Sequence, residues 1–543
     1  MAVKELSQTL NFTKEEVLQA YQVGRESREV SLIGRKEVFA GKAKFGIFGD
    51  GKEVAQLAMA KVFEPGDFRS GYYRDQTFML AIDELTLDQY FAQLYAHTSI
   101  EADPASAGRM MNGHFGTRLL HDDGSWKVLS QLKNSSSDIS PTAGQMLRLL
   151  GLAYASKLYR QNPDLHNLTQ FSVHGNEVSF GTIGNASTSE GIFFETINAA
   201  GVLQVPMLIS VWDDEYGISV PKEYHTTKGS ISEALRGFQR DSTTGQGYEI
   251  FTVKGWDYQA LCETYQRAAK VCREQHVPVL VHVVEMTQPQ GHSTSGSHER
   301  YKSKERLEWE KQHDCLLKMR QWILENEWAD EATLEQIDQE AKKTANKARE
   351  NAWKAFNASI KPQFSQALDL LQKVATQSSQ SAELQKLVQE LKDIVHPIKS
   401  DTVRVLRKAL RWLSQEKHPA KGEVLSLLQT LQTQAADDYN SHLYSQSAES
   451  ALLVPEVKPV YAEEAKWVDG REVLQACFDA ILSRDPRVFA IGEDVGKIGD
   501  VNQAFAGLQE KHGELRVTDT SIREATIIGQ GIGAAMRGLR PIT

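Results

Sequence analysis

Two hydrophobic periodicities alternate along the first half of the chain. Between about residues 15 and 290, apolar positions that recur every three or four residues alternate with short, continuous apolar runs. The first pattern predicts amphipathic helices, and the second predicts buried strands. Strands that alternate with helices are typical of a doubly wound α/β domain with a parallel sheet. We therefore expect this half of the chain to form such a domain.

One strand-helix-strand unit is especially clear in this pattern. Residues 178–183 predict a strand, and Thr188 and Ser189 are candidate caps for a helix that ends at Gly201. A second strand is predicted over 206–212. A β-α-β unit places the carboxyl ends of both strands at one crevice, where open parallel sheets bind their ligands. The residues that follow these two strands are therefore candidates for a ligand site.

The pattern changes after about residue 305. Charged and Gln-rich helical repeats dominate as far as residue 460, including an apolar stripe over 384–394 that ends at Pro397. Asp401 and Thr402 are candidate caps for the helix that follows. The stretch predicts a helical connector. An interaction coiled coil is the weaker alternative, because the heptads do not persist.

An α/β pattern resumes in the last part of the chain. The expected elements are helices over 472–482, 501–511 and 524–537, and strands over 488–491, 516–518 and from 540 onward. These elements are too few for a complete second α/β domain, so we expect a truncated one. The predicted division of the chain is 1–304, 305–460 and 461–543.

The charge and the hydropathy of the chain exclude two classes of partner. The formal net charge is −10, whereas a nucleic-acid ligand requires a basic face. No apolar run approaches the roughly 18–20 residues that span a bilayer. The segment 1–12 also lacks the basic start and the apolar core of a signal peptide. We therefore expect a soluble, cytoplasmic protein without nucleic-acid or membrane partners.

Two segments that follow the predicted strands over 178–183 and 206–212 resemble a cofactor-binding motif. Residues 183–191 and 212–219 are similar to the thiamine diphosphate motif, in which a Gly-acid-Gly/Ala turn precedes an Asn-Asn pair. The diphosphate is bound through a divalent metal, which needs hard oxygen ligands, and a helix N-terminus favours the phosphates. The resemblance implies Asn185, Asp214 and the backbone carbonyl of Tyr216 as Mg²⁺ ligands.

Both side-chain ligands depart from the usual residues of this motif. Asn185 stands where relatives usually carry an acid, and Asp214 stands where they usually carry Asn. The exchange keeps one carboxylate and one amide, so the formal charge at the metal is unchanged and metal binding is expected to be retained. The resemblance also implies that Gly184, Ala186 and Ile218 contact the cofactor.

Further upstream, the chain resembles the decarboxylating component of thiamine-diphosphate-dependent 2-oxo-acid dehydrogenases, most closely the branched-chain type. Residues 71–75, Gly-Tyr-Tyr-Arg-Asp, are similar to the family's diphosphate-gripping segment, which implies Tyr73 and Arg74 as cofactor ligands. The fixed fork of donors on arginine suits phosphate oxygens. Ser140 and Thr142 lie in a Ser-Pro-Thr segment where related chains touch the cofactor.

Two histidines are candidate catalytic residues by the same resemblance. His114 lies in 108–116, which resembles the family's Gly-Arg-x-Met-x-x-His segment. His292 lies in 290–295, which resembles the Gly-His-Ser loop at the mouth of the active site. A histidine can donate to a phosphate or a substrate carboxylate, and it titrates near neutral pH. The resemblance implies that both side chains orient substrate or lipoyl groups and handle protons.

The last segment resembles the β-type subunit of this family, so the chain reads as an α-type region fused to the start of a β-type region. Residues 491–495 and 519–524 carry the resemblance. It implies that Glu524 hydrogen-bonds to the aminopyrimidine ring of the cofactor and so promotes loss of the C2 proton, in an apolar surround that includes Ile522. Glu493 is implied as a supporting acid. The alternative role of Glu524 is to complement a helix dipole.

The resemblance implies oxidative decarboxylation of a 2-oxo acid, either a branched-chain 2-oxo acid or pyruvate, with acyl transfer to the lipoyl group of a partner acyltransferase. The fusion implies a homodimer in place of a two-chain tetramer. Two alternatives stay open: another thiamine diphosphate enzyme such as a transketolase, and a non-catalytic assembly subunit. Because the β-type region is short, we expect little decarboxylase activity from the chain alone.

Overall fold

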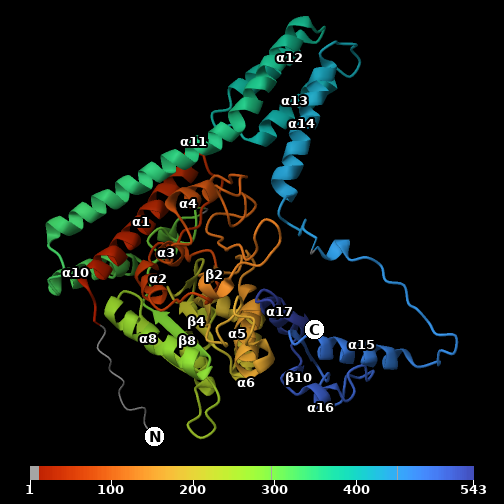
Figure 1. Cartoon of the computed structure of the whole chain (residues 1–543). Helices are drawn as coiled ribbons and strands as arrows, with labels where there is room; N and C mark the ends of the chain where they lie inside the picture. Colours follow the sequence, from red (N-terminus) through yellow and green to blue (C-terminus); the bar gives the residue numbers. More distant parts are fainter. Residues whose placement is uncertain (1–10, 295, 449) are drawn as a thin grey trace.

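A six-stranded parallel sheet forms the centre of the computed structural model, which describes residues 11–294, 296–448 and 450–543. The strand order is β2-β1-β3-β4-β8-β7, and every neighbouring pair is parallel (Figure 1). The strands are β1 (Phe68–Ser70), β2 (Asn134–Ser135), β3 (Ser179–Gly184), β4 (Met207–Trp212), β7 (Glu249–Lys254) and β8 (Val279–Val284). The predicted parallel α/β domain is confirmed.

Helices cover both faces of this sheet (Figure 1). Helices α2 (Glu53–Ala60) and α8 (Tyr258–Gln275) pack on one face, and α5 (Gln145–Gln161) and α6 (Gly191–Leu203) pack on the other. All six residues of β4 are buried, as expected for a central parallel strand with a helix layer on each side. This arrangement leaves the carboxyl ends of β3 and β4 as the place where side chains can converge.

The connection from β3 to α6 differs from the prediction. Residues Asn185–Ser189 form a 3₁₀ turn, so Thr188 and Ser189 lie inside that turn and are not helix caps. The Thr188 hydroxyl donates instead to the Asn185 carbonyl at 2.6 Å. The helix also continues past Gly201, because an internal glycine costs a helix only about 1 kcal/mol. The inserted turn leaves Asn185 directly at the end of the strand.

Further short elements surround this sheet. The two-residue strands β5 (Tyr216–Gly217) and β6 (Val220–Pro221) pair antiparallel just beyond β4. The remaining helices of this region are α1 (Lys14–Phe39), α3 (Gln76–Ala81), α4 (Leu87–Leu94), α7 (Ile231–Ala234), α9 (Lys304–Gln312) and α10 (Cys315–Glu325). In the described part of the chain, no helix has the length and apolar character that crossing a membrane requires.

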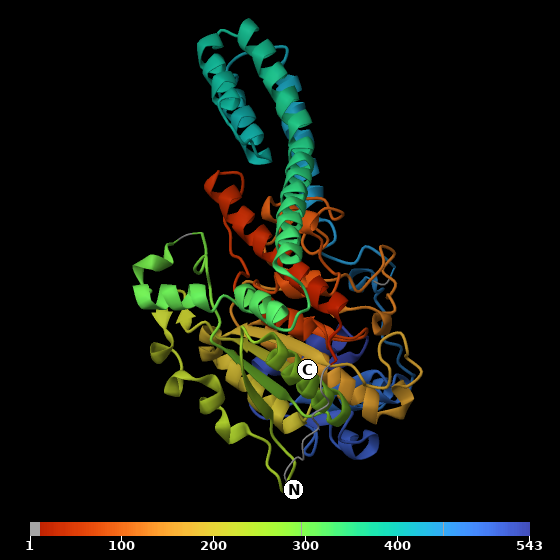
Figure 2. The same ribbon diagram turned by 90° about the vertical axis from the view of Figure 1, so that its left-hand side faces the viewer.

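The connector is helical, as its sequence predicts. It contains α11 (Glu331–Gln377), α12 (Ser381–Lys392), α13 (Lys399–Trp412) and α14 (Lys421–Asn440). Figures 1 and 2 show α11 crossing the body and continuing into a projecting bundle with α12, α13 and α14. The predicted caps of α13 are wrong: the helix begins before Asp401, whose carboxylate accepts the Ile398 N–H at 3.0 Å.

The connector contributes to two separate cores. The first half of α11 packs its alanines and Phe356 against α1 and α4, whereas its second half forms a core with α12, α13 and α14. Leu316 and Met319 of α10 belong to the core of the large sheet. We therefore propose that the first unit ends within α11 and not at residue 304.

The C-terminal segment forms a small parallel sheet of order β10-β9-β11. Its elements are α15 (Gly470–Arg484), β9 (Val488–Gly492), α16 (Leu508–His512), β10 (Val517–Asp519), α17 (Glu524–Ala535) and β11 (Arg540–Ile542). The helix predicted over 501–511 is confined to α16. The Asp500 carboxylate accepts the N–H groups of Asn502 and Ala504, and such a local turn competes with helix formation.

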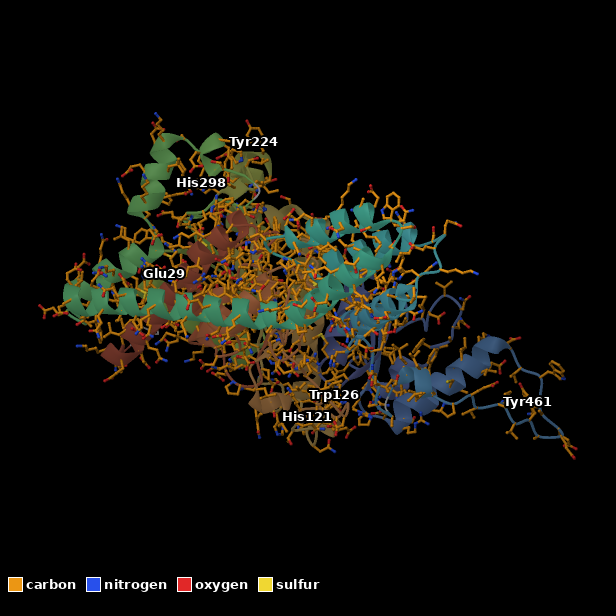
Figure 3. The ribbon with its side chains drawn as sticks, turned by 90° about the horizontal axis from the view of Figure 1, so that it is seen from above. Glu29, His121, Trp126, Tyr224, His298 and Tyr461 are labelled. Atoms are coloured by element: carbon orange, nitrogen blue, oxygen red, sulfur yellow. The ribbon has the colours of Figure 1, made fainter. Side chains whose placement is uncertain are left out.

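Close backbone packing joins this small unit to the large one. A Cβ on Gly151 of α5 would lie 2.1 Å from the Gln530 carbonyl oxygen of α17, so only glycine fits this contact. The buried Arg537 guanidinium also donates to Glu177 at 2.6 Å. Figure 3 shows Tyr461, which is 78% exposed, on the extended segment that connects this unit to the bundle.

Candidate functional site

A cavity of about 400 Å³ opens at the carboxyl ends of β3 and β4. Its walls come from the loops that follow these strands, from the segments after β1 and β2, and from the chain after β8. Most of the site residues predicted from sequence line it: Tyr73, Arg74, Thr142, Gly184, Asn185, Ala186, Asp214, Tyr216, Ile218 and His292. The structure thus brings together residues from five separate segments, whereas their role in binding stays a prediction.

A buried lysine that the sequence analysis missed stands next to the predicted metal ligand Asp214. Lys52 Nζ lies 2.8 Å from Asp214 Oδ2 and also donates to the Thr287 carbonyl at 2.8 Å and to Gln288 Oε1 at 2.7 Å. Burial disfavours the charged carboxylate, but Lys52, with smaller contributions from Lys302 and Arg74, outweighs burial and lowers the pKa of Asp214 to about 2. The Asp214 carboxylate is therefore ionised at neutral pH.

Asn185 offers the cavity an unsatisfied amide. The side chain is buried, and its Nδ2 has no hydrogen-bond partner among the described residues. A buried donor without a partner is costly by about 1–3 kcal/mol, which points to a ligand or water as its partner. An amide can give its oxygen to a metal and its N–H groups to phosphate oxygens.

The three predicted metal ligands therefore fit a hard cation. Asp214 supplies a carboxylate, Asn185 an amide, and Tyr216 a backbone carbonyl, and all three residues line the cavity. Mg²⁺ is commonly held by one or two carboxylates together with phosphate oxygens and waters. Within the described ranges, no group of three or more His, Cys, Asp or Glu side chains could hold a metal ion.

A hydrogen-bonded chain braces the loop that carries Asp214. Asp213 Oδ2 lies 2.9 Å from His282 Nε2, and His282 Nδ1 lies 2.9 Å from the Ser232 hydroxyl. The other oxygen of Asp213 accepts the Glu215 N–H at 2.8 Å. Because His282 is buried within β8, these bonds fix the loop to the sheet. Sequence periodicity gave no signal for this contact.

Arg74 and His292 form one unit at the cavity wall. Arg74 Nη2 lies 3.1 Å from His292 Nδ1 and donates to the His292 carbonyl at 2.9 Å. A guanidinium can only donate, so Nδ1 accepts and the proton of the neutral ring is on Nε2. Burial, with a smaller contribution from Arg74, lowers the pKa of His292 to about 4. In this arrangement, His292 has a pKa below the near-neutral value that is ordinary for histidine.

This environment makes a prediction about the pH dependence of stability. The folded state holds the pKa of His292 near 4, below its ordinary 6.5, so the unfolded chain binds the proton first as the pH falls. The stabilisation from neutral His292 should be complete above about 6.5 and be lost between about 6.5 and 4. We expect the difference in urea midpoint between wild type and His292→Asn to shrink over this range.

The control for this measurement is the exposed His121 (Figure 3). His121→Asn removes a histidine with little burial, so its difference from wild type should stay constant with pH. A His292→Asn difference that is equally flat would contradict the neutral, arginine-bonded state of His292.

His114 and Ser140 are not among the residues that line this cavity. The buried His114 accepts from the Ser140 hydroxyl through Nε2 at 3.0 Å and donates from Nδ1 to the Met111 carbonyl at 3.0 Å. Its ring lies 6.1 Å from the ring of Tyr73, which does line the cavity. Tyr73 therefore connects His114 with the cavity.

The predicted residues of the β-type region are not brought to the cavity of their own chain. Glu493 and Glu524 are exposed, and Ile522 is 81% exposed, so the predicted apolar surround of Glu524 is not formed. The cause is the packing of α17, whose glycine face lies on α5. Nearby, Thr526 donates to Glu195 of α6 at 2.9 and 2.8 Å through its N–H and its hydroxyl.

Comparisons with known proteins agree with both halves of this arrangement. Residues 31–361 match the family model described as "Dehydrogenase E1 component", and residues 466–543 match the one described as "Transketolase, pyrimidine binding domain". The predicted family resemblance, an α-type region followed by a β-type region, is thereby confirmed.

Individual relatives come from the same group. The 2-oxoisovalerate dehydrogenase subunit alpha of Bacillus subtilis is 27% identical over 324 residues, which cover 59% of this chain and 84% of that protein. The beta subunit from the same organism is 59% identical over 61 residues, 11% of this chain and 19% of that protein. The pyruvate dehydrogenase E1 component subunit alpha of Rickettsia bellii is 29% identical over 178 residues, 32% of this chain and 51% of that protein.

Proposed function

The chain belongs to the dehydrogenase E1 component family, and from this premise we propose that it takes part in thiamine-diphosphate-dependent oxidative decarboxylation of a 2-oxo acid. The substrate would be a branched-chain 2-oxo acid or pyruvate, and the acyl group would pass to the lipoyl group of a partner acyltransferase. The observation that carries the proposal is the convergence of Asn185, Asp214 and Arg74 on one cavity at the strand ends.

Each of these residues has a role that its chemistry supports. Arg74 would hold the diphosphate through its forked donors, while Asn185, Asp214 and the carbonyl of Tyr216 would hold Mg²⁺. Bound thiamine diphosphate would supply the nucleophilic carbon that adds to the keto group of the substrate. His292 would donate from Nε2 to a substrate carboxylate or a phosphate, because Arg74 occupies its Nδ1.

The exposed face of α17 supports the proposal that two copies complete each site. Glu524, Ile528 and Ile532 follow one another at intervals of four, so they share one face of the helix. Ile528 is 53% and Ile532 51% exposed, whereas the glycines on the other face are buried. An exposed apolar stripe of this kind favours association. We propose a homodimer in which Glu524 of one copy faces the cavity of the other.

A titration of the full-length chain with thiamine diphosphate tests the metal site. In wild type, thiamine diphosphate should bind more tightly with magnesium than with a chelator. Asp214→Ala removes the only carboxylate among the proposed ligands, so this difference in cofactor affinity should disappear. Loss of even an outer-shell partner of a metal typically costs about ten- to hundredfold in metal affinity, so loss of a direct ligand should cost at least that much. Asp241→Ala, at an exposed turn, is the matched control and should keep wild-type magnesium dependence. Unchanged dependence in Asp214→Ala would refute the proposed ligand set.

A non-catalytic subunit is the second candidate function. It is favoured by the Lys52 ammonium, which already neutralises Asp214 in place of a metal, and by the distance of Glu524 from the cavity wall of its own chain. The same titration separates the two, because an assembly subunit would bind no thiamine diphosphate with or without magnesium.

A further inference from the structure

A second cavity of about 410 Å³ lies where the connector packs on the first unit, and we call it the connector cavity. One side is formed by the segment after α1, the end of α4 and the segment before His114, and the other by α11, α13 and α14. None of the residues that line it lines the cavity at the strand ends. It is therefore a separate site, built partly from the helices of the connector.

The connector cavity combines an apolar wall with unpaired positive charge. Its apolar side chains include Leu94, Tyr95, Phe356, Ile360 and Ile398. Its charged side chains are all basic: Lys42, Lys44, Arg109 and Lys399. Of these, Lys42 pairs with Glu37 and Lys399 pairs with Asp438.

Arg109 and Lys44 carry the charge that is left over. Within the described ranges, neither has a carboxylate within 4.0 Å. Arg109 uses Nη2 for the carbonyls of Asp438 and Ser441, at 2.9 and 2.7 Å, while its buried Nε has no partner among the residues that the structure describes. Nη2 also donates to the Ser441 hydroxyl at 3.3 Å. A guanidinium that meets only neutral oxygens at a cavity wall retains its charge and further donors for an anion.

We propose that the connector cavity binds a small amphipathic anion, a hydrocarbon chain that ends in one carboxylate. The apolar wall would take the chain, and Arg109 with Lys44 would take the carboxylate. The volume falls within the range of about 300–1,000 Å³ that is usual for small-molecule sites. A cation would meet the surplus positive charge, and a neutral chain would leave the Arg109 donors unsatisfied.

The position of this site gives its occupant access to the predicted catalytic segment. Gln93 lines the connector cavity, accepts the Gly113 N–H at 2.7 Å and donates to the His114 carbonyl at 2.6 Å. Met111, which also lines the cavity, accepts from His114 Nδ1. The bound chain would therefore contact the residues that hold His114.

Calorimetric titration of the full-length chain with octanoate, and separately with 1-octanol, tests this proposal. We expect saturable binding of one octanoate per chain, and binding of octanol weaker by about tenfold or more, because one charged hydrogen bond contributes about 1.5–3 kcal/mol. Arg109→Gln should weaken the binding of octanoate by a similar factor and leave the binding of octanol unchanged. Ser359→Trp, which fills the cavity from α11, should abolish both.

The control for the filled cavity is Ser365→Trp, at an exposed position of the same helix, which should bind octanoate like wild type. Equal affinity for octanoate and octanol would overturn the proposal, as would octanoate binding that survives Ser359→Trp or that thiamine diphosphate displaces. If Ser359→Trp fails to fold, Arg109→Gln and the octanol comparison decide. Thiamine diphosphate titrated into the same samples reports separately on the cavity at the carboxyl ends of β3 and β4, which we call the strand-end cavity. A failure of octanoate to bind would therefore leave the proposed function intact.

Discussion

Two variants that are each inactive are expected to restore activity to one another when they are coexpressed. Asp214→Ala disables the strand-end cavity, and Glu524→Gln keeps the shape of the side chain but removes its acid. If the cavity of one copy is completed by Glu524 of the other, a hybrid dimer contains one site with both residues intact. Random assortment in a symmetric dimer should then recover about one quarter of the wild-type sites.

The readout follows directly from the proposed role of Glu524. Exchange of the cofactor's C2 proton with solvent, measured by NMR on bound thiamine diphosphate, reports this step without substrate or lipoyl partner. Loss of a general acid–base group typically slows such proton transfer by about 10²–10⁴-fold, so each single variant should lie close to background. The proton exchange recovered in the mixture is then measured against almost no exchange from either variant alone.

The reciprocal mixture distinguishes completion by a second copy from completion within one chain. When the double variant Asp214→Ala/Glu524→Gln is coexpressed with wild type, both sites of each hybrid lack one residue if the copies exchange Glu524. About one quarter of the activity should remain, whereas about one half would remain if each chain completed its own site. No recovery in the first mixture together with one half in the second would discard the two-copy site.

The strand-end cavity was predictable because its residues lie at places that the chain pattern itself defines. Asn185 and Asp214 follow two consecutive parallel strands, and the carboxyl ends of such strands meet at one edge of the sheet. Once the pattern of 178–212 is recognised, their proximity follows from the topology alone. The segments with Arg74 and His292 needed the family resemblance in addition, because nothing in their spacing relates them to this edge.

The contacts that were missed depend on tertiary packing. Lys52 reaches Asp214 across 162 residues of sequence, and a lysine at a helix start carries no signal of burial. The orientation of Glu524 is set by the glycine face of α17 against α5, which the apolar pattern of α17 does not reveal. Likewise, Pro362 would suggest a helix end, yet α11 continues through it, supported by neighbours on both sides.

Lys52→Met is expected to weaken the unliganded protein and to increase its response to magnesium. Methionine keeps the length of the side chain but leaves Asp214 without its 2.8 Å partner in a buried setting, where loss of one member of an ion pair costs about 3–5 kcal/mol. The midpoint of urea unfolding should therefore fall clearly. Lys373→Met breaks a pair whose side chains are 51% and 53% exposed, for which about 0–1 kcal/mol is expected.

The response to magnesium carries the functional part of this prediction. In the wild type, a Mg²⁺ ion bound as we propose would share Asp214 with an ammonium that already compensates its charge. In Lys52→Met, no ammonium would be bonded directly to the Asp214 carboxylate, although Lys302 and Arg74 remain nearby. Magnesium with thiamine diphosphate should therefore raise the unfolding midpoint more than in wild type. An equal rise in both proteins would show that the cofactor does not engage Asp214. A midpoint as high as that of Lys373→Met would show that Lys52 is not needed to neutralise the buried carboxylate.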